Sequence, residues 1–543
     1  MKKTSKLLAM LLACILVMSL LASCAGGGSP STNTDTNTNT NTETNTDTGN
    51  DVGSGDGTDT NSGGAASNPD RVLNLGATQD SGTLYPLGVT GGFISVIYAF
   101  YEPLYHTLED GSRRWVLATG LDRISDLQYT LTLRDDVTFS NGNPMTAEDV
   151  MFTMEQCKDN PQFSLNVKVV DFEKTKVTGD YTIDLWYTEF NASQEPGFAS
   201  LLVMDKESFD EASLSRNPVG TGPYVVKDYV VNSHLAITAR DDYWGGEVPI
   251  KNVTYHVINE EAQIINALET GDIDYSGTVS LKDASYVESL GYDVHVNPSR
   301  FSYVTMFSMR DGTPLASKEA RWAVSHAIDS ESIVEIVTYG LGEVPVYASS
   351  KFQYDFEDRF ANTHDTYSIG YDPVLAEQYA EQSGLKNETL RIITNGSSIF
   401  NTIAEMVQSN LLDIGVTAEI VSYDQATYFG ILMDDSNFEI AIFNPLAPSY
   451  LAVDILTMYL TFIPLGWSGP DRDLYGEISM GAIGTSDEKE RGDKLFEQVK
   501  MFAEFAPWYA VCEAVAAVAI SKDIGGYVGP SSLYFLTDLY FVN

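Results

Sequence analysis

Hydrophobic residues along the middle of the chain follow two periods, which predicts strands alternating with a helix. Apolar and polar side chains alternate in 235–238 and again in 253–258, as in strands with one buried face. Within 264–268 the apolar positions instead have helical spacing, and Gly271 can end that helix in a left-handed conformation. We expect Asn259 to cap its first turn. The stretch has no nucleophile beside a base, so it predicts a scaffold.

A second combination of periods lies further along the chain. Two short apolar runs, 389–394 and 416–422, flank a segment whose apolar residues have helical spacing. This order is typical of a βαβ unit, which has parallel strands. In parallel sheets ligands lie beyond the carboxyl ends of the strands, and 394–397 has that position here. A later predicted strand, 438–443, is followed in the same way by 444–450.

Capping residues indicate where further helices begin. Thr146 opens a Thr-Ala-Glu-Asp segment, which predicts a capping box and a helix to about Cys157. Asp329 is predicted to cap a helix over 332–339. Apolar residues also recur with helical spacing over 94–105, which predicts an amphipathic helix there.

The chain begins with three lysines in its first six residues, followed by an apolar run from 7 to 20. That run is short for a membrane-spanning helix, and this arrangement is typical of a secretory signal peptide. Leu-Ala-Ser-Cys at 21–24 resembles the lipobox of bacterial lipoproteins. The resemblance implies that residues 1–23 are removed and that Cys24 becomes the lipidated first residue at the outer face of the cytoplasmic membrane. An ordinary signal peptide cut nearby is the alternative.

Residues 25–66 consist mainly of Gly, Ser, Thr, Asn and Asp, and their charged side chains are all acidic. Such a segment cannot bury enough apolar surface to fold. A flexible coil of this length has a root-mean-square span of roughly 35 Å. We therefore expect 24–66 to be a lipidated cysteine followed by a disordered tether that lifts a globular body off the membrane.

Charge and composition exclude several classes of function. The formal net charge of −43 argues against nucleic acid or anionic lipid as a direct partner. The globular body has two cysteines, Cys157 and Cys512, which we expect to be buried free thiols rather than a disulfide framework. We find no His-Glu-x-x-His, Gly-x-Ser-x-Gly or Ser-x-x-Lys motif, and the six histidines have no metal-binding spacing. The sequence therefore predicts no catalytic residues, metal or cofactor.

Several short segments carry a family resemblance, and they follow one another in that family's order. They are Tyr-Glu-Pro-Leu at 101–104, Thr-Ala-Glu-Asp-Val at 146–150, Gly-Thr-Gly-Pro-Tyr at 220–224, Asp-Tyr-Trp-Gly-Gly at 242–246 and Leu-Glu-Thr-Gly-Asp-Ile-Asp at 268–274. Together they resemble the solute-binding proteins of ABC importers, family 5, which includes oligopeptide-, dipeptide- and nickel-binding members. The resemblance extends from Val72 to the end of the chain.

This resemblance implies a two-lobe α/β fold of the periplasmic-binding-protein type (cluster C, type II). An additional small α/β subdomain is expected in the first lobe. The predicted divisions are a signal peptide 1–23, a lipidated tether 24–66, a first lobe 67–296 with its extra subdomain at about 85–195, a second lobe 297–506, and a return to the first lobe at 507–543.

The resemblance also implies a function. A monomer would capture a peptide or a similar polar solute between its lobes and deliver it to the permease subunits of an ABC importer. A surface receptor that senses the solute is the alternative, and a secreted enzyme is a more distant one. Residues at the expected lobe faces are the candidate ligand contacts: Asp80, Phe301, Tyr303, Asn395, Ser397, Asn444 and Tyr450.

Two family anchors for dipeptides have no counterpart in this sequence. In the dipeptide-binding branch, an Asp after the late strand holds the ammonium group and an Arg after the first βαβ strand holds the carboxylate. Ala447 stands at the first position, and Thr394 or Asn395 at the second. We expect the nearest acid, Asp454, to face elsewhere. Unpaired buried charges are costly, so the site should reject free dipeptides and favour longer peptides or uncharged polar solutes such as sugars.

Overall fold

The structure analysed is a computed structural model. It describes residues 71–542, except for 90–93, 109, 161, 364–369, 434–437, 447–448, 464 and 530–534. The predicted signal peptide, Cys24, the tether and Ala447 lie outside the described residues. Among the residues that are described, no helix is both long and apolar enough to cross a membrane.

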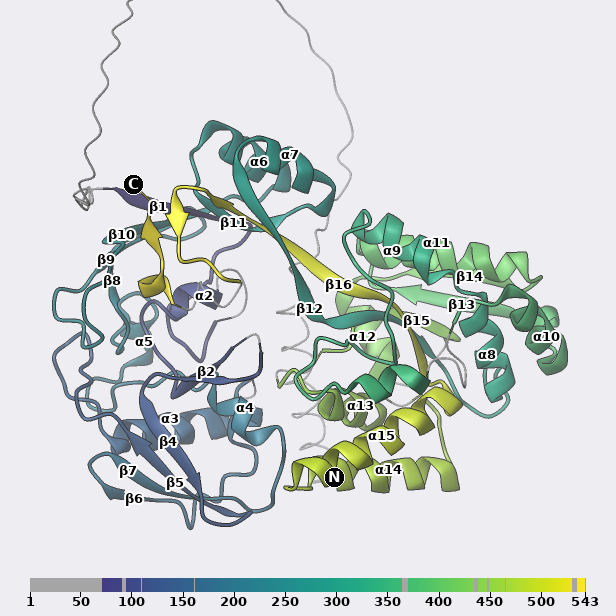
Figure 1. Cartoon of the computed structure of the whole chain (residues 1–543), viewed down its shortest axis with the longest axis horizontal. Helices are drawn as coiled ribbons and strands as arrows, with labels where there is room; N and C mark the ends of the chain where they lie inside the picture. The colour runs from purple at the N-terminus through teal and green to yellow at the C-terminus, as the bar shows by residue number, and fades with distance from the viewer. Residues whose placement is uncertain are drawn as a thin grey trace, which may run out of the picture.

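One ten-stranded sheet runs through both lobes of the molecule (Figure 1). Its first-lobe strands, in sheet order, are β11 (Tyr275–Val279), β1 (Val72–Ala77), β10 (Asn252–Val257), β9 (His234–Ala239) and β8 (Tyr224–Val230). Its second-lobe strands are β15 (Ile440–Phe443), β13 (Thr389–Thr394) and β14 (Thr417–Ser422). The two crossing strands, β12 (Tyr292–Phe307) and β16 (Trp508–Ser521), lie between these groups.

The crossing strands β12 and β16 are the connection between the lobes within the sheet (Figure 1). They pair antiparallel along almost their whole length, with a register shift between Pro298 and Ser302. Arg300 lies within this shift and has a left-handed φ of 60°. An irregularity of this kind is a bulge, which bends the strand and increases its twist. The lobe boundaries at 296–297 and 506–507 stay predictions.

The first lobe also contains a separate four-stranded antiparallel sheet. In sheet order its strands are β4 (Ala118–Arg123), β5 (Gln128–Leu133), β7 (Thr182–Trp186) and β6 (Lys176–Gly179). Helix α3 (Ala147–Asp159) shares a core with it and begins at the predicted capping box, in which Asp149 Oδ2 accepts a hydrogen bond from Thr146 N. Shorter elements are β2 (Tyr105–Thr107), β3 (Arg113–Trp115), α4 (Gln194–Phe198), α5 (Glu211–Leu214), β17 (Ile524–Gly525) and β18 (Tyr540–Phe541).

The second lobe is built around the predicted βαβ unit, which the structure confirms. Helix α11 (Ser398–Asp413) connects β13 to β14, and β13 pairs parallel with both β14 and β15. Further helices of this lobe are α8 (Lys318–Ala327), α9 (Ser330–Thr338), α10 (Pro373–Ser383), α12 (Gln425–Met433), α13 (Ala452–Phe462), α14 (Pro470–Ile483) and α15 (Glu488–Phe505). One large apolar core joins these elements to β12, β15 and the start of β16.

The prediction of a helix over 94–105 is wrong. Only Ile94–Ile97, labelled α2, is helical. The backbone after it bonds to the glycine turn of the first lobe, where Gly222 N donates to Phe100 O over 2.8 Å. Glycine is needed for this approach, because a Cβ on Gly220 would lie 2.1 Å from Phe100 O. Long-range hydrogen bonds therefore replace the helical bonds that the apolar spacing predicted.

The start of the next predicted helix also differs. Helix α6 (Glu261–Thr270) has Glu260 at its N-cap, with no side-chain cap bond, so the prediction that Asn259 caps it is wrong. Asp329 does cap α9, since its side chain accepts a hydrogen bond from Ser332 N. Helix α6 and the short α7 (Ala284–Ser289) form a small core against the crossing strands (Figure 1).

Candidate functional site

Among the described residues, the two lobes touch at several places, of which two are well separated. The turn between β2 and β3 approaches the second lobe, because a Cβ added to Gly111 would lie 3.1 Å from Tyr354 Cδ1. At the end of α14, Ala192 N of the first lobe donates to Ile483 O of the second over 2.9 Å. These contacts bring side chains from both lobes to a shared interface.

Asp454, in the first turn of α13, lies at this interface. Its Oδ2 accepts a hydrogen bond from Ser449 Oγ over 2.8 Å. Ser193 of the first lobe lies near the carboxylate, although its buried Oγ makes no hydrogen bond of good geometry. Burial raises the pKa of Asp454, and Ser449, Ser193 and the positive charge of Lys168 partly oppose that shift. Two of these groups belong to the opposite lobe, so Asp454 lies where the lobes meet, and the expectation that it faces away from the solute stays a prediction.

Tyr98 and Tyr450 form a second approach between the lobes. Burial raises the pKa of Tyr98, and nearby Tyr450 of the second lobe raises it further. The Tyr98 ring lies 5.2 Å from that of His106, and its hydroxyl is hydrogen bonded to Ser200. Sequence reasoning found Tyr450 but missed Tyr98, because no local pattern distinguishes a tyrosine whose partner lies far along the chain.

Asp80, a candidate from the first lobe, is held by local partners. Its Oδ1 accepts from Tyr229 OH over 2.5 Å and from Gly82 N over 2.7 Å. Its Oδ2 accepts from Asn232 N over 2.8 Å. These bonds tie the loop after β1 to the β8–β9 hairpin. A ligand role for Asp80 stays a prediction, and the contacts described support a structural role.

Phe301 and Tyr303 follow the bulge on β12. Tyr303 is 8% exposed and belongs to the core of the second lobe, where its ring lies 6.2 Å from Phe400. Phe301 is half-buried, and its ring meets that of Tyr303 edge-on at 5.7 Å. The two candidates are therefore brought together, with Phe301 the more accessible of the pair.

Asn395 and Ser397 also lie together, beyond the carboxyl end of β13 as predicted. Asn395 Nδ2 donates to Gln425 Oε1 over 2.9 Å, and its Oδ1 accepts from Ser397 N over 3.1 Å. Ser397 is the N-cap of α11, and its Oγ accepts from Phe400 N. Both side chains thus stabilise the start of a helix, and their ligand role stays a prediction.

Asn444 and Tyr450 bound the segment that follows β15. Asn444 is half-buried, and Tyr450 has a left-handed φ of 52°. Immediately after it, the carboxylate of Asp355 accepts hydrogen bonds from Ala452 N over 2.5 Å and Val453 N over 3.0 Å. Burial raises the pKa of Asp355 to about 6, although these two amides oppose the shift. The segment is therefore fixed at its end, where α13 begins.

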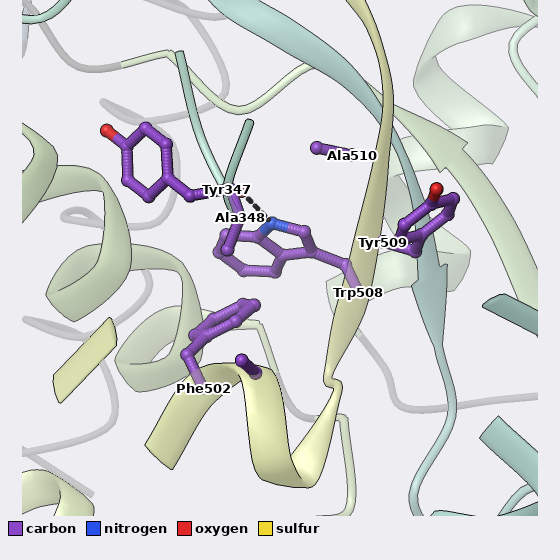
Figure 2. A pocket seen from close by; sticks show the side chains of 7 residues that line it. Tyr347, Ala348, Phe502, Trp508, Tyr509 and Ala510 are labelled. Carbon is purple, nitrogen blue, oxygen red and sulfur yellow. Dashed lines mark hydrogen bonds between the residues drawn. The ribbon is translucent and has the colours of Figure 1, made fainter. Parts of the chain in front are cut away.

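A small cavity in the second lobe lies apart from this interface. Figure 2 shows Trp508, whose Nε1 donates to Ala348 O over 2.7 Å, with the ring of Phe502 at 4.4 Å. The cavity has a volume of about 10 Å³ and lies between Tyr347, Ala348 and the start of β16. That is room for about one water molecule. The cavity is therefore too small for a solute.

Neither cysteine of the globular body has a reactive environment. Cys157 and Cys512 are buried and free, as predicted. Burial raises the pKa of each thiol to about 12, so neither is a thiolate near neutral pH. Within the described part of the chain, no group of three or more His, Cys, Asp or Glu side chains could hold a metal ion.

The two lobes, the crossing strands and the interface define a solute-binding protein. Residues 116–461 match the family described as bacterial extracellular solute-binding proteins, family 5. The match covers more than half of the chain, and the protein belongs to this family. The family resemblance predicted from the short sequence motifs is confirmed, and so is the two-lobe α/β fold of the periplasmic-binding-protein type.

Known relatives are similar in sequence and in structure. The nickel-binding periplasmic protein of Escherichia coli (strain K12) is 24% identical over 363 residues, 61% of this chain and 67% of the relative. The substrate-binding protein CtaP of an ABC transporter from Listeria monocytogenes has a TM-score of 0.77 at 22% identity, covering 87% of this chain and 99% of that one. The oligopeptide-binding protein AppA from Bacillus subtilis, solved with a nonapeptide, has a TM-score of 0.69 at 19% identity, with coverages of 87% and 99%.

Proposed function

We propose that this protein captures a peptide or a similar polar solute between its lobes and delivers it to the permease subunits of an ABC importer. The observation that carries the proposal is the interface at which both lobes contribute polar and aromatic groups. Tyr98 and Ser193 come from the first lobe, and Tyr450 and Asp454 from the second. A solute that contacts both lobes favours the closed form, because only differential affinity shifts such an equilibrium.

We further propose that the solute is a peptide held mainly through its backbone, or an uncharged polar solute. The candidate contacts remain Asp80, Phe301, Tyr303, Asn395, Ser397, Asn444 and Tyr450, and Asp454 is added because it lies between the lobes. The nonapeptide in the solved structure of AppA from Bacillus subtilis supports a peptide-sized ligand. We propose no catalytic role for any residue of the chain.

Calorimetry with three groups of solutes tests this proposal: free dipeptides, amidated longer peptides and oligosaccharides. We expect binding from the second or third group. Micromolar binding of ordinary free dipeptides would contradict the proposed solute class, and binding of none of the three groups would contradict solute capture as described. Asp454→Asn should weaken the binding of the bound solute by roughly tenfold, the range expected for one hydrogen bond to a charged group.

Asp413→Asn is the matched control for this variant. Asp413 is an exposed acid of the same lobe, at the end of α11, and the substitution changes the net charge by the same amount. We expect its affinity to equal that of the unaltered protein. Equal weakening in both variants would assign the effect to the field of the acidic surface rather than to a contact of Asp454.

The anchoring of the protein forms a separate part of the proposal. We propose that Cys24 carries the lipid and that 24–66 tethers a monomeric body to the outer face of the cytoplasmic membrane. Cys24→Ala should abolish metabolic lipid labelling and release the protein into the soluble fraction. Labelling that persists in this variant would overturn the assignment.

A surface receptor for sensing is the second candidate function, and a secreted enzyme is a distant third. The receptor hypothesis predicts that the protein binds the same solute but does not take part in its transport. Uptake of the bound solute by cells that carry or lack the gene separates the two, because an importer component is required for uptake and a sensor is not.

A further inference from the structure

A loop of the second lobe, residues 343–356, lies against the crossing strands, and we call it the hinge loop. Glu513 N of β16 donates to Glu343 O over 2.9 Å at the start of this loop. Lys351 N donates back to Glu513 Oε1 over 3.1 Å, and Trp508 Nε1 binds Ala348 O. The hinge loop is therefore attached at several points to β16, one of the two strands that join the lobes.

The bulge of β12 holds the same loop from its other side. Arg300, with its left-handed φ, donates from Nη1 to Phe352 O. Its guanidinium lies 4.4 Å from the centre of the Tyr354 ring. A cation in this position is attracted by the ring, with a strength of roughly 0.5–1 kcal/mol at exposed sites and more when desolvated. The irregular point of the crossing strand thus fixes the position of Tyr354.

Tyr354 in turn holds the segment that contains candidate ligand residues. Its N donates to Tyr450 O over 3.1 Å, and the two rings meet edge-on at 6.3 Å. The next residue, Asp355, binds Ala452 N and Val453 N at the start of α13. Two neighbouring residues of the hinge loop therefore set the conformation of 450–453, which leads directly to Asp454.

The first lobe contacts this arrangement at the same tyrosine. Gly111, in the turn between β2 and β3, has a φ of 79° and approaches the Tyr354 ring so closely that a Cβ would lie 3.1 Å from Cδ1. Tyr354 is thus in contact with the crossing strand, with the 450–453 segment and with the opposite lobe.

We infer that Arg300 and Tyr354 are positioning residues of the solute site. The bulge of β12 holds Tyr354, and Tyr354 holds 450–453 in the conformation on which the first lobe closes. Hinge motions are absorbed by a few residues that undergo large φ/ψ changes. Arg300, with its left-handed φ, lies at the irregular point of a strand that joins the lobes. The inference deepens the proposed function and rests on it, because it treats 450–453 as part of the solute site.

Hydrogen exchange of the solute-free protein tests the positioning directly. Arg300→Ala and Tyr354→Ala should increase the exchange rates of the Ala452 and Val453 amides by roughly threefold or more, the factor that corresponds to one cation–π contact. Arg300→Lys keeps the positive charge and should be intermediate. Amides of β13 serve as an internal reference for global stability. Unchanged rates in Arg300→Ala would overturn the inference, even if Tyr354→Ala fails to fold.

Distance measurements between the lobes test the coupling to closure. Dyes on Glu173→Cys and Glu419→Cys, both exposed positions in opposite lobes, report lobe separation in the body 67–543, whose own thiols, Cys157 and Cys512, are buried. Gly111→Ala should favour the open form by roughly fivefold, the low end of the range for overpacking. Adding Tyr354→Ala should remove that effect, because the clashing ring is absent.

Gly142→Ala is the matched control for Gly111→Ala. Gly142 also has a positive φ, 89°, in a first-lobe turn, but no atom lies within 4 Å of its added Cβ. The Gly142→Ala substitution introduces similar backbone strain but no contact with the second lobe, so lobe separation should not change. An equal effect of both glycine substitutions would overturn the closure part of the inference.

These experiments separate the inference from the proposed function. If the unaltered protein binds none of the three solute groups, the proposed function fails, while the exchange rates still decide whether Arg300 and Tyr354 hold 450–453. If it binds a solute and Arg300→Ala binds that solute with the same affinity and closure, only the inference fails.

Discussion

Two buried glutamates allow the interior of the first lobe to be compared with the crossing strands. Burial raises the pKa of Glu102 and of Glu513 to about 7. Glu102 accepts hydrogen bonds from Tyr243 OH over 2.7 Å and Trp244 Nε1 over 3.1 Å, so all its partners named here belong to the first lobe. It joins Tyr-Glu-Pro-Leu to Asp-Tyr-Trp-Gly-Gly, two of the segments that carry the family resemblance.

Glu513 binds a different kind of partner. It accepts from Ser302 Oγ of β12 over 3.2 Å and from Lys351 N of the hinge loop over 3.1 Å. None of these residues lies in the five short motifs at 101–104, 146–150, 220–224, 242–246 and 268–274. A buried glutamate that accepts hydrogen bonds therefore stabilises the interior of the first lobe in the case of Glu102, and the connection between the lobes in the case of Glu513. The difference teaches that the short sequence motifs belong to the interior of the first lobe, whereas the connection between the lobes is held by residues outside these motifs.

The largest expected effect on stability comes from a substitution in the glycine turn of the first lobe. Gly220→Ala places a Cβ 2.1 Å from Phe100 O and 2.7 Å from Tyr101 Cδ1, and the backbone oxygen cannot move aside cheaply. We expect the free energy of unfolding to fall by about 3 kcal/mol, the upper range for overpacking. Denaturant unfolding measures it. Gly120→Ala, with no atom within 4 Å and no left-handed φ, is the control and should change little.

Replacing Glu102 or Glu513 by alanine tests whether the two glutamates have different roles. Glu102→Ala leaves the hydroxyl of Tyr243 and the indole N–H of Trp244 without this partner, which should cost about 2 kcal/mol of stability. Glu513→Ala should instead change the lobe separation reported by the dye pair, since it frees the hinge loop from β16. If Glu102→Ala altered lobe separation as much as Glu513→Ala, the division between scaffold and hinge would be wrong.

A smaller effect is expected from pH. The folded protein holds the protons of both glutamates at pH values where the unfolded chain, with ordinary carboxyl groups near pH 4.5, has lost them. Stability should therefore fall as pH rises from about 4.5 to about 7. Glu513→Gln keeps a neutral side chain throughout and should flatten this slope by about 1 kcal/mol per pH unit. Denaturant unfolding at several pH values measures the slope, and an unchanged slope in the variant would contradict the role of burial.

Local sequence patterns predicted the elements whose bonds are local. The capping box at Thr146, the cap at Asp329 and the βαβ unit ending at Ser422 all depend on residues close together in the chain. The helix over 94–105 failed because that backbone bonds to a distant glycine turn. The spacing of apolar residues gives no information about a hydrogen-bond partner that lies so far away in the sequence.

The candidate site could be predicted less completely for the same reason. Asn395 and Ser397 were placed correctly beyond a parallel strand, because the βαβ pattern specifies that position. The proximity of Ser193 to Asp454, and the stacking of Arg300 on Tyr354, depend on how two lobes and a loop meet. A single sequence gives no local signal for these contacts.

Small-angle scattering with and without a solute that binds in calorimetry tests the central claim most directly. The account predicts that the radius of gyration of the body, residues 67–543, decreases at saturation, because a solute between the lobes stabilises the closed form. An unchanged radius of gyration at saturation would contradict capture between the lobes.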